Sequence, residues 1–263
     1  MADRWGRYVV AAGLAMIAVT ARADDAPRVV RLGVATDTDR ALIEAAAPAG
    51  LTEGVRLEAV GFADAGKAAA ALAAGQIDGS VAQDAQVVAA NPQVCAAGYT
   101  VTDPMGLYAQ QLSALREVPV GGVVALPADR AGQGRALLLL QRYGLVRLDP
   151  AAGLTPRPKD IVDNPRKLRW HALPAARLPG ALRTSALVAM PYAAAASANL
   201  APARDAIGME DARVPWANVL AVRAGECGIG GAGWVAATVA ALHAPAVKTF
   251  ILARFNDSVR RPW

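Results

Sequence analysis

The segment that most constrains the fold runs from residue 121 to residue 141. Gly121 to Leu126 has the apolar, β-branched character of a strand, and Pro127-Ala128-Asp129 interrupts it. The residues from Gly132 to Gln141 have the composition of an apolar helix, and Asp129 is placed to cap its start. A strand followed directly by a helix is half of a βαβ unit, so this segment predicts a parallel sheet covered by helices.

Arg135 lies in the first turns of this predicted helix. The unpaired N–H groups and the dipole of a helix favour an anion at this end. A guanidinium also holds a carboxylate through two parallel hydrogen bonds. We therefore expect Arg135 to bind the carboxylate of a small ligand. The alternative is a solvated arginine on the helix surface, since most arginines are exposed.

The N-terminal part of the chain repeats the alternation of strand and helix. Strands are predicted at 28–35, 55–60 and 77–82, with helices near 40–47 and 66–74 between them. This order predicts a mostly parallel sheet with helices on both faces. Ligands of such sheets bind at the carboxyl ends of the strands, where Asp84 is placed.

A second α/β pattern follows and predicts a second lobe, with a short helix beginning at Lys159. We expect lobe 1 to comprise 28–108 and 214–263 and lobe 2 to comprise 112–208, with hinge crossovers at 109–111 and 209–213. A cleft between two such lobes, closing on a hinge, suits the enclosure of a small molecule.

The N-terminus has the pattern of a cleavable signal peptide over residues 1–23. Arg4 and Arg7 precede an uncharged apolar run, and Ala21-Arg22-Ala23 is a small-x-small cleavage signature. We therefore expect export to the periplasm. No cysteine ends the apolar run, so no lipid anchor is expected there. In an oxidising compartment Cys95 and Cys227 either form a disulfide or stay as buried thiols, and the sequence leaves both open.

Composition and motifs argue against several other functions. The net charge of +5 comes from scattered Lys and Arg with no basic block, so no nucleic-acid partner is expected. The only histidines, His171 and His243, lack neighbours at metal-ligand spacing and lie in no nucleophile motif, so neither a metal site nor an enzyme is expected. Gly228 to Gly233 matches a dinucleotide fingerprint by letter, but too little chain follows it. We predict a flexible turn there and no cofactor.

Several segments together resemble the NlpA/MetQ family of methionine-binding lipoproteins, the substrate receptors of an ABC importer. The similarity covers about 29–263 and rests on Asp103-Pro-Met-Gly-Leu-Tyr108, Gln133-Gly-Arg-Ala-Leu-Leu-Leu-Leu-Gln141, Lys159-Asp-Ile-Val-Asp-Asn-Pro165, Pro215-Trp-Ala-Asn218 and Ala241-Leu-His-Ala-Pro-Ala-Val-Lys248. The resemblance implies an α/β, type II periplasmic-binding-protein fold with two lobes of mostly parallel sheet joined by a two-crossover hinge. It also implies an ABC permease as partner and a ligand carboxylate on Arg135. Asn218 matches a family ligand residue, and Gln133 either contacts the ligand or shapes the turn.

The chain departs from the family around the expected ligand side chain. Val81-Ala82-Gln83-Asp84 stands where the family usually has Phe-Phe-Gln-His, and Ala65 replaces an aromatic residue. Pro191-Tyr192-Ala193-Ala194 replaces an Asn-Gly-Asn-Tyr stretch, and Tyr192 remains a candidate ligand residue. Asp84 either receives a ligand ammonium or cationic side chain, or caps the next helix.

These observations predict a monomeric periplasmic solute-binding protein for methionine or a related small amino-acid-like ligand. The loss of aromatic side chains leaves two alternatives. One is a ligand-sensing or interaction protein that keeps the fold without transport, and the other is a receptor for a different carboxylate-bearing ligand.

Overall fold

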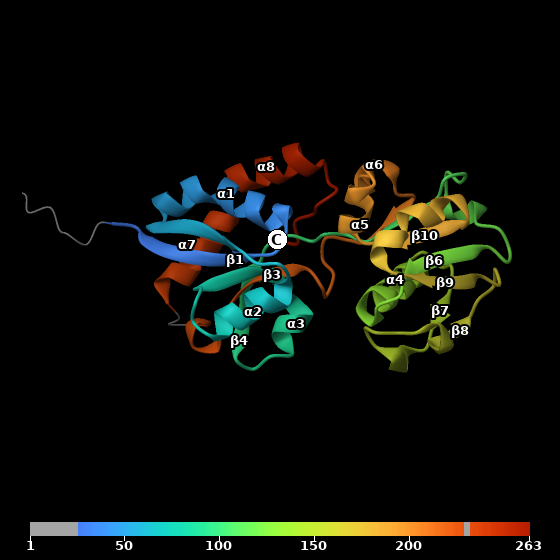
Figure 1. Cartoon of the computed structure of the whole chain (residues 1–263), viewed down its shortest axis with the longest axis horizontal. Coiled ribbons are helices and arrows are strands. Elements are labelled where there is room, and N and C mark those ends of the chain that lie inside the picture. The colour runs from blue at the N-terminus through green and yellow to red at the C-terminus, as the bar shows by residue number, and fades with distance from the viewer. Residues whose placement is uncertain (1–25, 229–231) are drawn as a thin grey trace, which may run out of the picture.

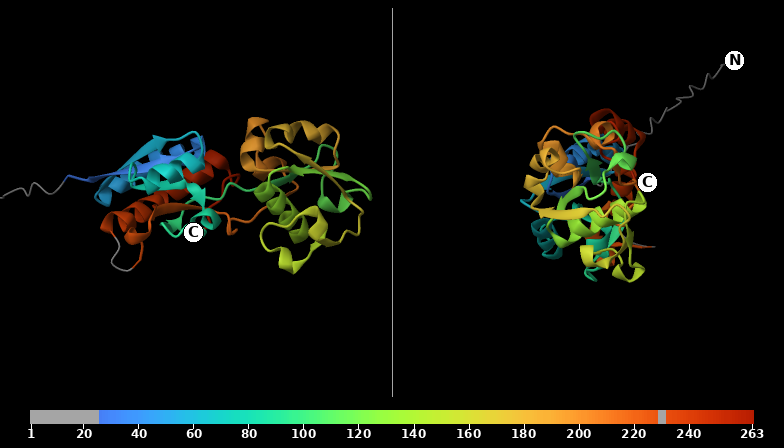
Figure 2. Two further views of the ribbon diagram at one scale, coloured as in Figure 1. Left: turned by 60° about the horizontal axis from the view of Figure 1, so that its bottom comes forward. Right: turned by 90° about the vertical axis from the view of Figure 1, so that its right-hand side faces the viewer.

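The computed structural model describes residues 26–228 and 232–263. They form two α/β lobes that lie end to end along the long axis of the molecule (Figure 1). A second direction of view separates the same two lobes (Figure 2). The predicted signal peptide lies outside the described residues, as does the middle of the predicted turn at Gly228 to Gly233.

Lobe 1 is built on a mixed sheet. Its strands, in sheet order, are β2 (Val55–Gly61), β1 (Arg28–Val34), β3 (Gly79–Asp84), β12 (Asn218–Arg223) and β4 (Val94–Tyr99). β1 is parallel to β2 and β3, whereas β12 is antiparallel to β3 and β4. The interior strand β12 is buried continuously from Val219 to Val222 and does not alternate, which is expected of a strand covered on both faces.

Helices cover both faces of this sheet (Figure 1). They are α1 (Asp37–Thr52), α2 (Ala65–Ala73), α3 (Ala85–Ala89), α7 (Gly233–Leu242) and α8 (Pro245–Phe255). One core joins α1, α7 and α8 to the sheet, and another joins α2 and α3 to its opposite face. A capping box begins the first helix: Thr36 accepts a hydrogen bond from Asp39 N, while the Asp39 carboxylate accepts one from Thr36 N. The helix is longer than predicted and continues through Pro48.

Lobe 2 has its own sheet. Its strands, in sheet order, are β11 (Gly208–Met209), β5 (Gly106–Tyr108), β10 (Leu187–Met190), β6 (Val123–Pro127) and β9 (Arg169–Leu173). The strand-turn-helix predicted first is β6 followed by α4 (Arg130–Arg142), which buries its leucines against one face. The opposite face is covered in part by α5 (Tyr192–Ser197), while α6 (Pro202–Asp205) follows it.

The short helix predicted from Lys159 is wrong in part. Pro158–Asp160 forms a 3-10 turn, and the chain then enters β8 (Ile161–Asp163), which pairs with β7 (Arg147–Leu148). The β-branched pair Ile161-Val162 favours the extended conformation, and the short run offered no period with which to distinguish the two.

The boundary expected between the lobes at Tyr108 also needs correction. β5 pairs with β10 and β11, so residues 106–108 belong to the sheet of lobe 2. The first crossing therefore lies before Gly106. It runs beside the second crossing, because Asn218 N donates to Val101 O and Thr100 N donates to Asn218 O, both at 2.8 Å.

The C-terminal tail packs on the same crossing. Thr102 and Arg260 exchange two backbone hydrogen bonds of 2.8 and 2.9 Å, and Trp263 Nε1 donates to Thr100 O at 2.7 Å. Trp263 also stacks on His243, with ring centroids 4.3 Å apart. The hinge is thus a bundle of extended segments with the tail attached to it.

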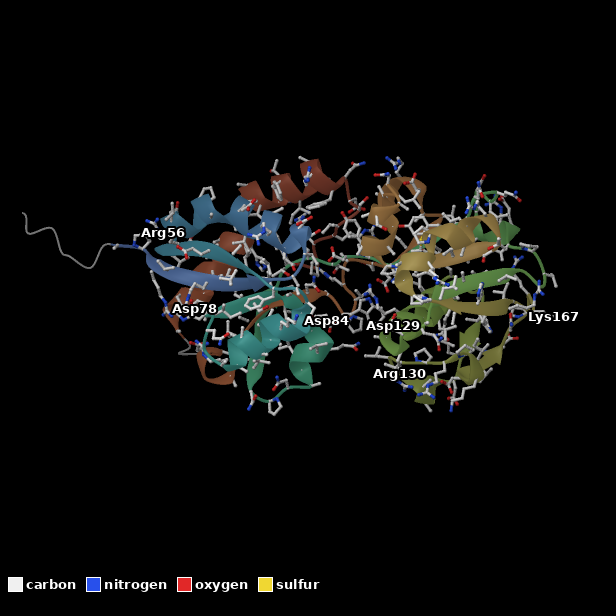
Figure 3. All side chains as sticks on the ribbon, in the orientation of Figure 1. Arg56, Asp78, Asp84, Asp129, Arg130 and Lys167 are labelled. Carbon is white, nitrogen blue, oxygen red and sulfur yellow. A yellow bond between two sulfur atoms is a disulfide. The ribbon has the colours of Figure 1, made fainter. Side chains whose placement is uncertain are left out.

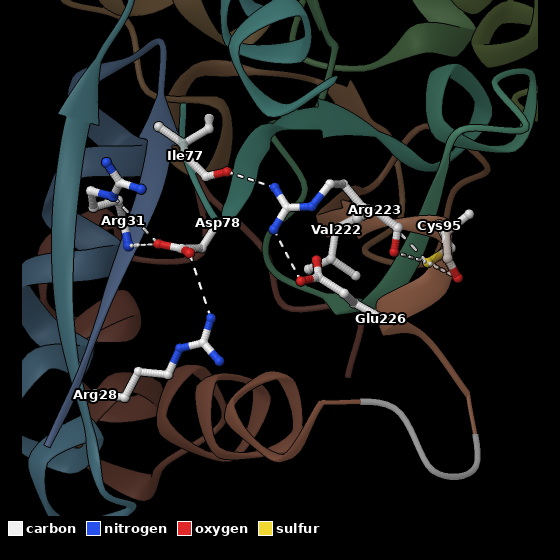
Figure 4. Close-up of polar contacts among 9 residues, drawn as sticks. Arg28, Arg31, Ile77, Asp78, Cys95, Val222, Arg223 and Glu226 are labelled. Atoms are coloured by element: carbon white, nitrogen blue, oxygen red, sulfur yellow. Dashed lines mark hydrogen bonds and ion pairs between the residues drawn. The ribbon is translucent and has the colours of Figure 1, made fainter. Parts of the chain in front are cut away.

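Cys95 and Cys227 form a disulfide that ties β4 to the loop after β12. Paired charges lie beside it at the outer part of lobe 1 (Figure 4). Asp78 lies within 3.6 Å of both Arg28 and Arg31, and Arg223 contacts Glu226 at 3.0 Å.

Candidate ligand-binding cleft

A cavity of about 220 Å³ lies between the lobes, at the carboxyl ends of β3 and β6. Its polar and aromatic lining includes Asp84, Gln86, Asp129, Arg135 and Trp216, together with Met105 of the first crossing. Larger hollows of about 490 Å³ lie within lobe 1 and within lobe 2, but each takes its lining from a single lobe. The cavity that joins both lobes and both crossings is the candidate site, because closure of the hinge would enclose it.

Arg135 projects from α4 toward the hinge. Asp129 caps this helix by accepting from Gly132 N at 2.8 Å. A Cβ at Gly132 would lie 2.7 Å from the Pro127 side chain, so glycine lets the helix start directly against the end of β6. The Arg135 side chain is 22% exposed and lines the cavity.

The Arg135 guanidinium already holds a carboxylate of the protein itself. Nε and Nη2 donate to the two Glu210 oxygens at 3.2 and 2.5 Å, and Nη2 also donates to Asp103 O at 3.2 Å. The Trp216 ring lies 5.2 Å from the guanidinium carbon. Nη1 has no hydrogen-bond partner among the described residues and remains available to a ligand.

Glu210 was not singled out by the sequence. It lies on the second crossing, its side chain is 3% exposed, and it also accepts a hydrogen bond from Met105 N at 2.8 Å. A buried carboxylate requires such partners. The signal available beforehand was an acidic residue in a predicted hinge segment opposite a candidate arginine, which was too weak to assign a pair.

Asp84 and Asp129 face the cavity from opposite lobes. Asp84 Oδ1 accepts from Gln86 N and Val87 N, each at 2.9 Å, so Asp84 does cap α3. Asp129 is the equivalent cap of α4 in lobe 2. In both carboxylates Oδ2 has no hydrogen-bond partner within the described ranges, so capping leaves each with an oxygen for a ligand.

Two hydrogen-bond donors of the cavity lining are unsatisfied. Gln86 Nε2 and Trp216 Nε1 are buried and have no acceptor among the described residues. Buried donors without a partner are uncommon and costly, so an acceptor on a ligand is a natural complement. Neither donor was predicted as a site group, because satisfaction of a donor depends on what packs against it.

Asp103, on the first crossing, is the most perturbed acid near the cleft. Its Oδ1 is buried without a donor. Burial raises the pKa of Asp103 to about 7, the charge of Asp39 adds to the rise, and Arg135 opposes it. Burial also raises the pKa of Tyr192, and the nearby Asp103 charge adds to this. Asp103 therefore lies within electrostatic range of Asp39 on α1 in lobe 1 and of Tyr192 on α5 in lobe 2.

The remaining predicted site residues lie near the cavity without lining it. Asn218 starts β12 and is the register partner of Asp84 on β3, so the two are neighbours across the sheet. Tyr192 follows Pro191, which does line the cavity. Gln133 lies on α4 and is not in the lining. The structure therefore groups Arg135 and Asp84 directly and places the other three beside them.

The two histidines lie outside the lining of the cavity. His171 lies in β9, and His243 packs on Trp263. Within the described ranges, no three His, Cys, Asp or Glu side chains come together as metal ligands. Of the helices described, none alone has the length and apolar composition of a membrane span; α7 and α8 meet that measure only as a pair bent by 44°.

Two α/β lobes on a double crossing, with a cavity between them, define a binding protein of the type II periplasmic class. The sequence matches the family model described as NlpA lipoprotein over residues 30–263, and the chain belongs to this family. The resemblance and the fold predicted from the sequence are confirmed.

Individual relatives and solved structures match most of the length of this chain. The probable D-methionine-binding lipoprotein MetQ of Vibrio cholerae is 34% identical over 200 residues, 74% of each chain. The D-methionine-binding lipoprotein MetQ of Escherichia coli K12 is 32% identical over 205 residues, 75% of this chain and 76% of that one. A nutrient binding protein from Burkholderia cenocepacia, solved bound to methionine, is 31% identical with a TM-score of 0.72, covering 90% of this chain and all of its own. An ABC transporter periplasmic substrate-binding protein from Coxiella burnetii is 32% identical with a TM-score of 0.73, covering 88% and 99%.

Proposed function

We propose that this protein is an exported solute-binding receptor that carries a small amino-acid-like ligand, methionine or a related compound, to an ABC importer. The observation that carries the proposal is the cavity between the lobes, lined by an arginine with a free nitrogen, two unsatisfied N–H donors and two carboxylates. An amino acid presents a carboxylate to the donors and an ammonium to the acids. Relatives named as methionine-binding lipoproteins support the ligand class.

The Arg135 position sets the expected orientation of the ligand. Its carboxylate accepts from Arg135 Nη1, while Glu210 keeps the rest of the guanidinium in place. Asn218 and Tyr192 contribute polar contacts as the lobes close, since both lie beside the cavity. Closure traps the ligand and presents one compact surface to the permease.

The proposal includes export through the signal peptide at 1–23 and a monomeric receptor in the periplasm. The relatives are named as lipoproteins, whereas no cysteine ends the apolar run of this sequence.

Thermal unfolding in the presence of single amino acids, including L- and D-methionine, tests the receptor function. A ligand at a hundred times its Kd stabilises the folded state by about 2.7 kcal/mol, which raises Tm by about 5–10 °C for a chain of this size. We expect the shift for amino acids and its loss when the carboxylate is replaced by an amide. A panel of amino acids and dipeptides without any shift would overturn the proposal.

Two observations favour a second candidate. Arg135 is neutralised by Glu210, and the aromatic and histidine side chains of the family are absent at Val81, Ala82 and Asp84. A receptor for a different carboxylate-bearing ligand, or a ligand sensor without transport, would keep the fold and lose methionine. Binding of other carboxylates in the same panel, with methionine inactive, would favour it.

A further inference from the structure

The charges that line the cleft do not balance. Arg135 is the basic residue of the lining, and Glu210 neutralises it through both carboxylate oxygens. Asp84 and Asp129 then remain as negative charges, and no salt bridge joins either to a cation among the described residues. A zwitterionic ligand of net charge zero leaves this excess uncompensated.

The two carboxylates belong to different lobes. Asp84 lies at the inner end of lobe 1, and Asp129 lies at the facing end of lobe 2 (Figure 3). Both line one cavity of about 220 Å³, so hinge closure brings two like charges together in a space that excludes water. Like charges repel more strongly as the dielectric falls, so the two carboxylates oppose closure of the empty cleft. A cation between them makes the electrostatic interaction across the cleft attractive.

The cleft also offers donors for an acid group, independently of these two carboxylates. Gln86 Nε2 and Trp216 Nε1 are buried without acceptors, and Arg135 Nη1 is available beside them. A ligand that complements the whole lining therefore needs one carboxylate and more than one positive charge.

We infer that the cleft selects a basic amino acid, whose α-ammonium and side-chain cation together bridge Asp84 and Asp129 across the two lobes, while its carboxylate meets Gln86, Trp216 and Arg135. This rests on the proposed amino-acid receptor function and narrows its ligand. The bridge couples recognition to closure, because one oxygen comes from each lobe. Oδ2 of each aspartate serves the ligand while Oδ1 keeps its helix cap.

Matched pairs of ligands test the inference by isothermal titration. Lysine is compared with norleucine, and arginine with citrulline, since each pair differs mainly in the side-chain charge. We expect lysine and arginine to bind at least about tenfold more tightly than their neutral partners at low salt, with the ratio shrinking as salt is added.

Variants locate the effect. Asp84→Asn and Asp129→Asn should each reduce the lysine-to-norleucine affinity ratio about tenfold, because asparagine keeps the cap and loses the charge. Asp64→Asn is the matched control: Asp64 caps α2 by accepting from Lys67 N at 2.8 Å, outside the cavity lining, and the ratio should not change.

The outcomes separate the two proposals. Tight methionine or norleucine binding with no gain for lysine would overturn the charge selectivity and leave the receptor function standing. An equal ratio in the Asp84→Asn and Asp129→Asn variants and in the native protein would also overturn it. No binding of any amino acid would overturn both.

Discussion

The acidic side chains in the outer part of lobe 1 are paired with arginines, whereas the two aspartates of the cleft between the lobes are not. Near the disulfide, Asp78 has two arginine neighbours and Glu226 has Arg223 (Figure 4). In the cleft, two aspartates keep an unbonded oxygen and two N–H donors have no acceptor. Carboxylates that are paired with arginines stabilise the fold, and carboxylates without a salt bridge are available to a cationic ligand, so charge pairing for stability and charge for binding lie in different places.

Removal of the Arg135 side chain should give the largest change in stability, because Arg135 both pairs with the buried Glu210 and lines the cavity. Arg135→Met leaves the buried Glu210 carboxylate without its cation, and we expect a loss of about 3–5 kcal/mol in the free energy of unfolding. Urea unfolding followed by circular dichroism measures this. Arg142→Met on the same helix breaks an exposed pair with Asp211 and should cost less than about 1 kcal/mol. Equal losses for the two variants would contradict a structural role for the Arg135–Glu210 pair.

The disulfide should affect stability without affecting binding. The loop between Cys95 and Cys227 has a sequence separation of 132, and opening it in a Cys95→Ser, Cys227→Ser double variant should cost about 2–4 kcal/mol. Ligand affinity should stay unchanged, since neither cysteine lines the cleft. A drop in affinity at full stability would show that the two regions are coupled, contrary to the separation described above.

Asp103 should give a smaller effect that depends on pH. Its folded-state pKa is raised from 3.8 to about 7, so the folded protein holds this proton more tightly than the unfolded chain. The resulting penalty is absent below about pH 4, grows as pH rises to 7, and is complete above it. The free energy of unfolding of the Asp103→Asn variant should therefore exceed that of the native protein by about 2 kcal/mol at pH 8, and the two should be equal near pH 4. The effect is limited because Asp103 is only partly buried.

Asp211 provides a control of opposite sign for the Asp103 measurement. The hydrogen bond from Arg142 lowers the pKa of Asp211, so its contribution is present at neutral pH and is lost as pH falls through the lowered value. Asp211→Asn should be slightly less stable than the native protein at pH 8. A gain for both variants at pH 8 would point to a general charge effect instead.

The start of α4 and the end of β3 could be predicted from the sequence, but the residues that contact them from other parts of the chain could not. Asp84 and Arg135 could be placed at one cleft because each follows a strand of a parallel sheet, and the ends of such strands meet at one edge. The Arg135–Glu210 pair joins residues far apart in the chain, and no local pattern specifies it. Gln86 and Trp216 were not predicted as site residues, although Trp216 lies in one of the segments that carry the family resemblance, because tertiary packing decides whether a donor is satisfied.

The error at the lobe boundary has a similar origin. The chain from 94 to 108 is extended throughout, and periodicity could not tell which part pairs with which sheet. β5 joins lobe 2 because β10 and β11 lie on either side of it, and both come much later in the sequence.

The place of β12 in the lobe 1 sheet sets the order in which the chain can assemble. This strand enters between β3 and β4, yet the whole of lobe 2 precedes it in the sequence. During synthesis, β3 and β4 thus keep unpaired edges until the second lobe has been made. Lobe 2, in contrast, has all the strands of its sheet in one continuous stretch of the chain. Lobe 2 is expected to form first, and a chaperone that shields strand edges would protect the nascent N-terminal half during that delay.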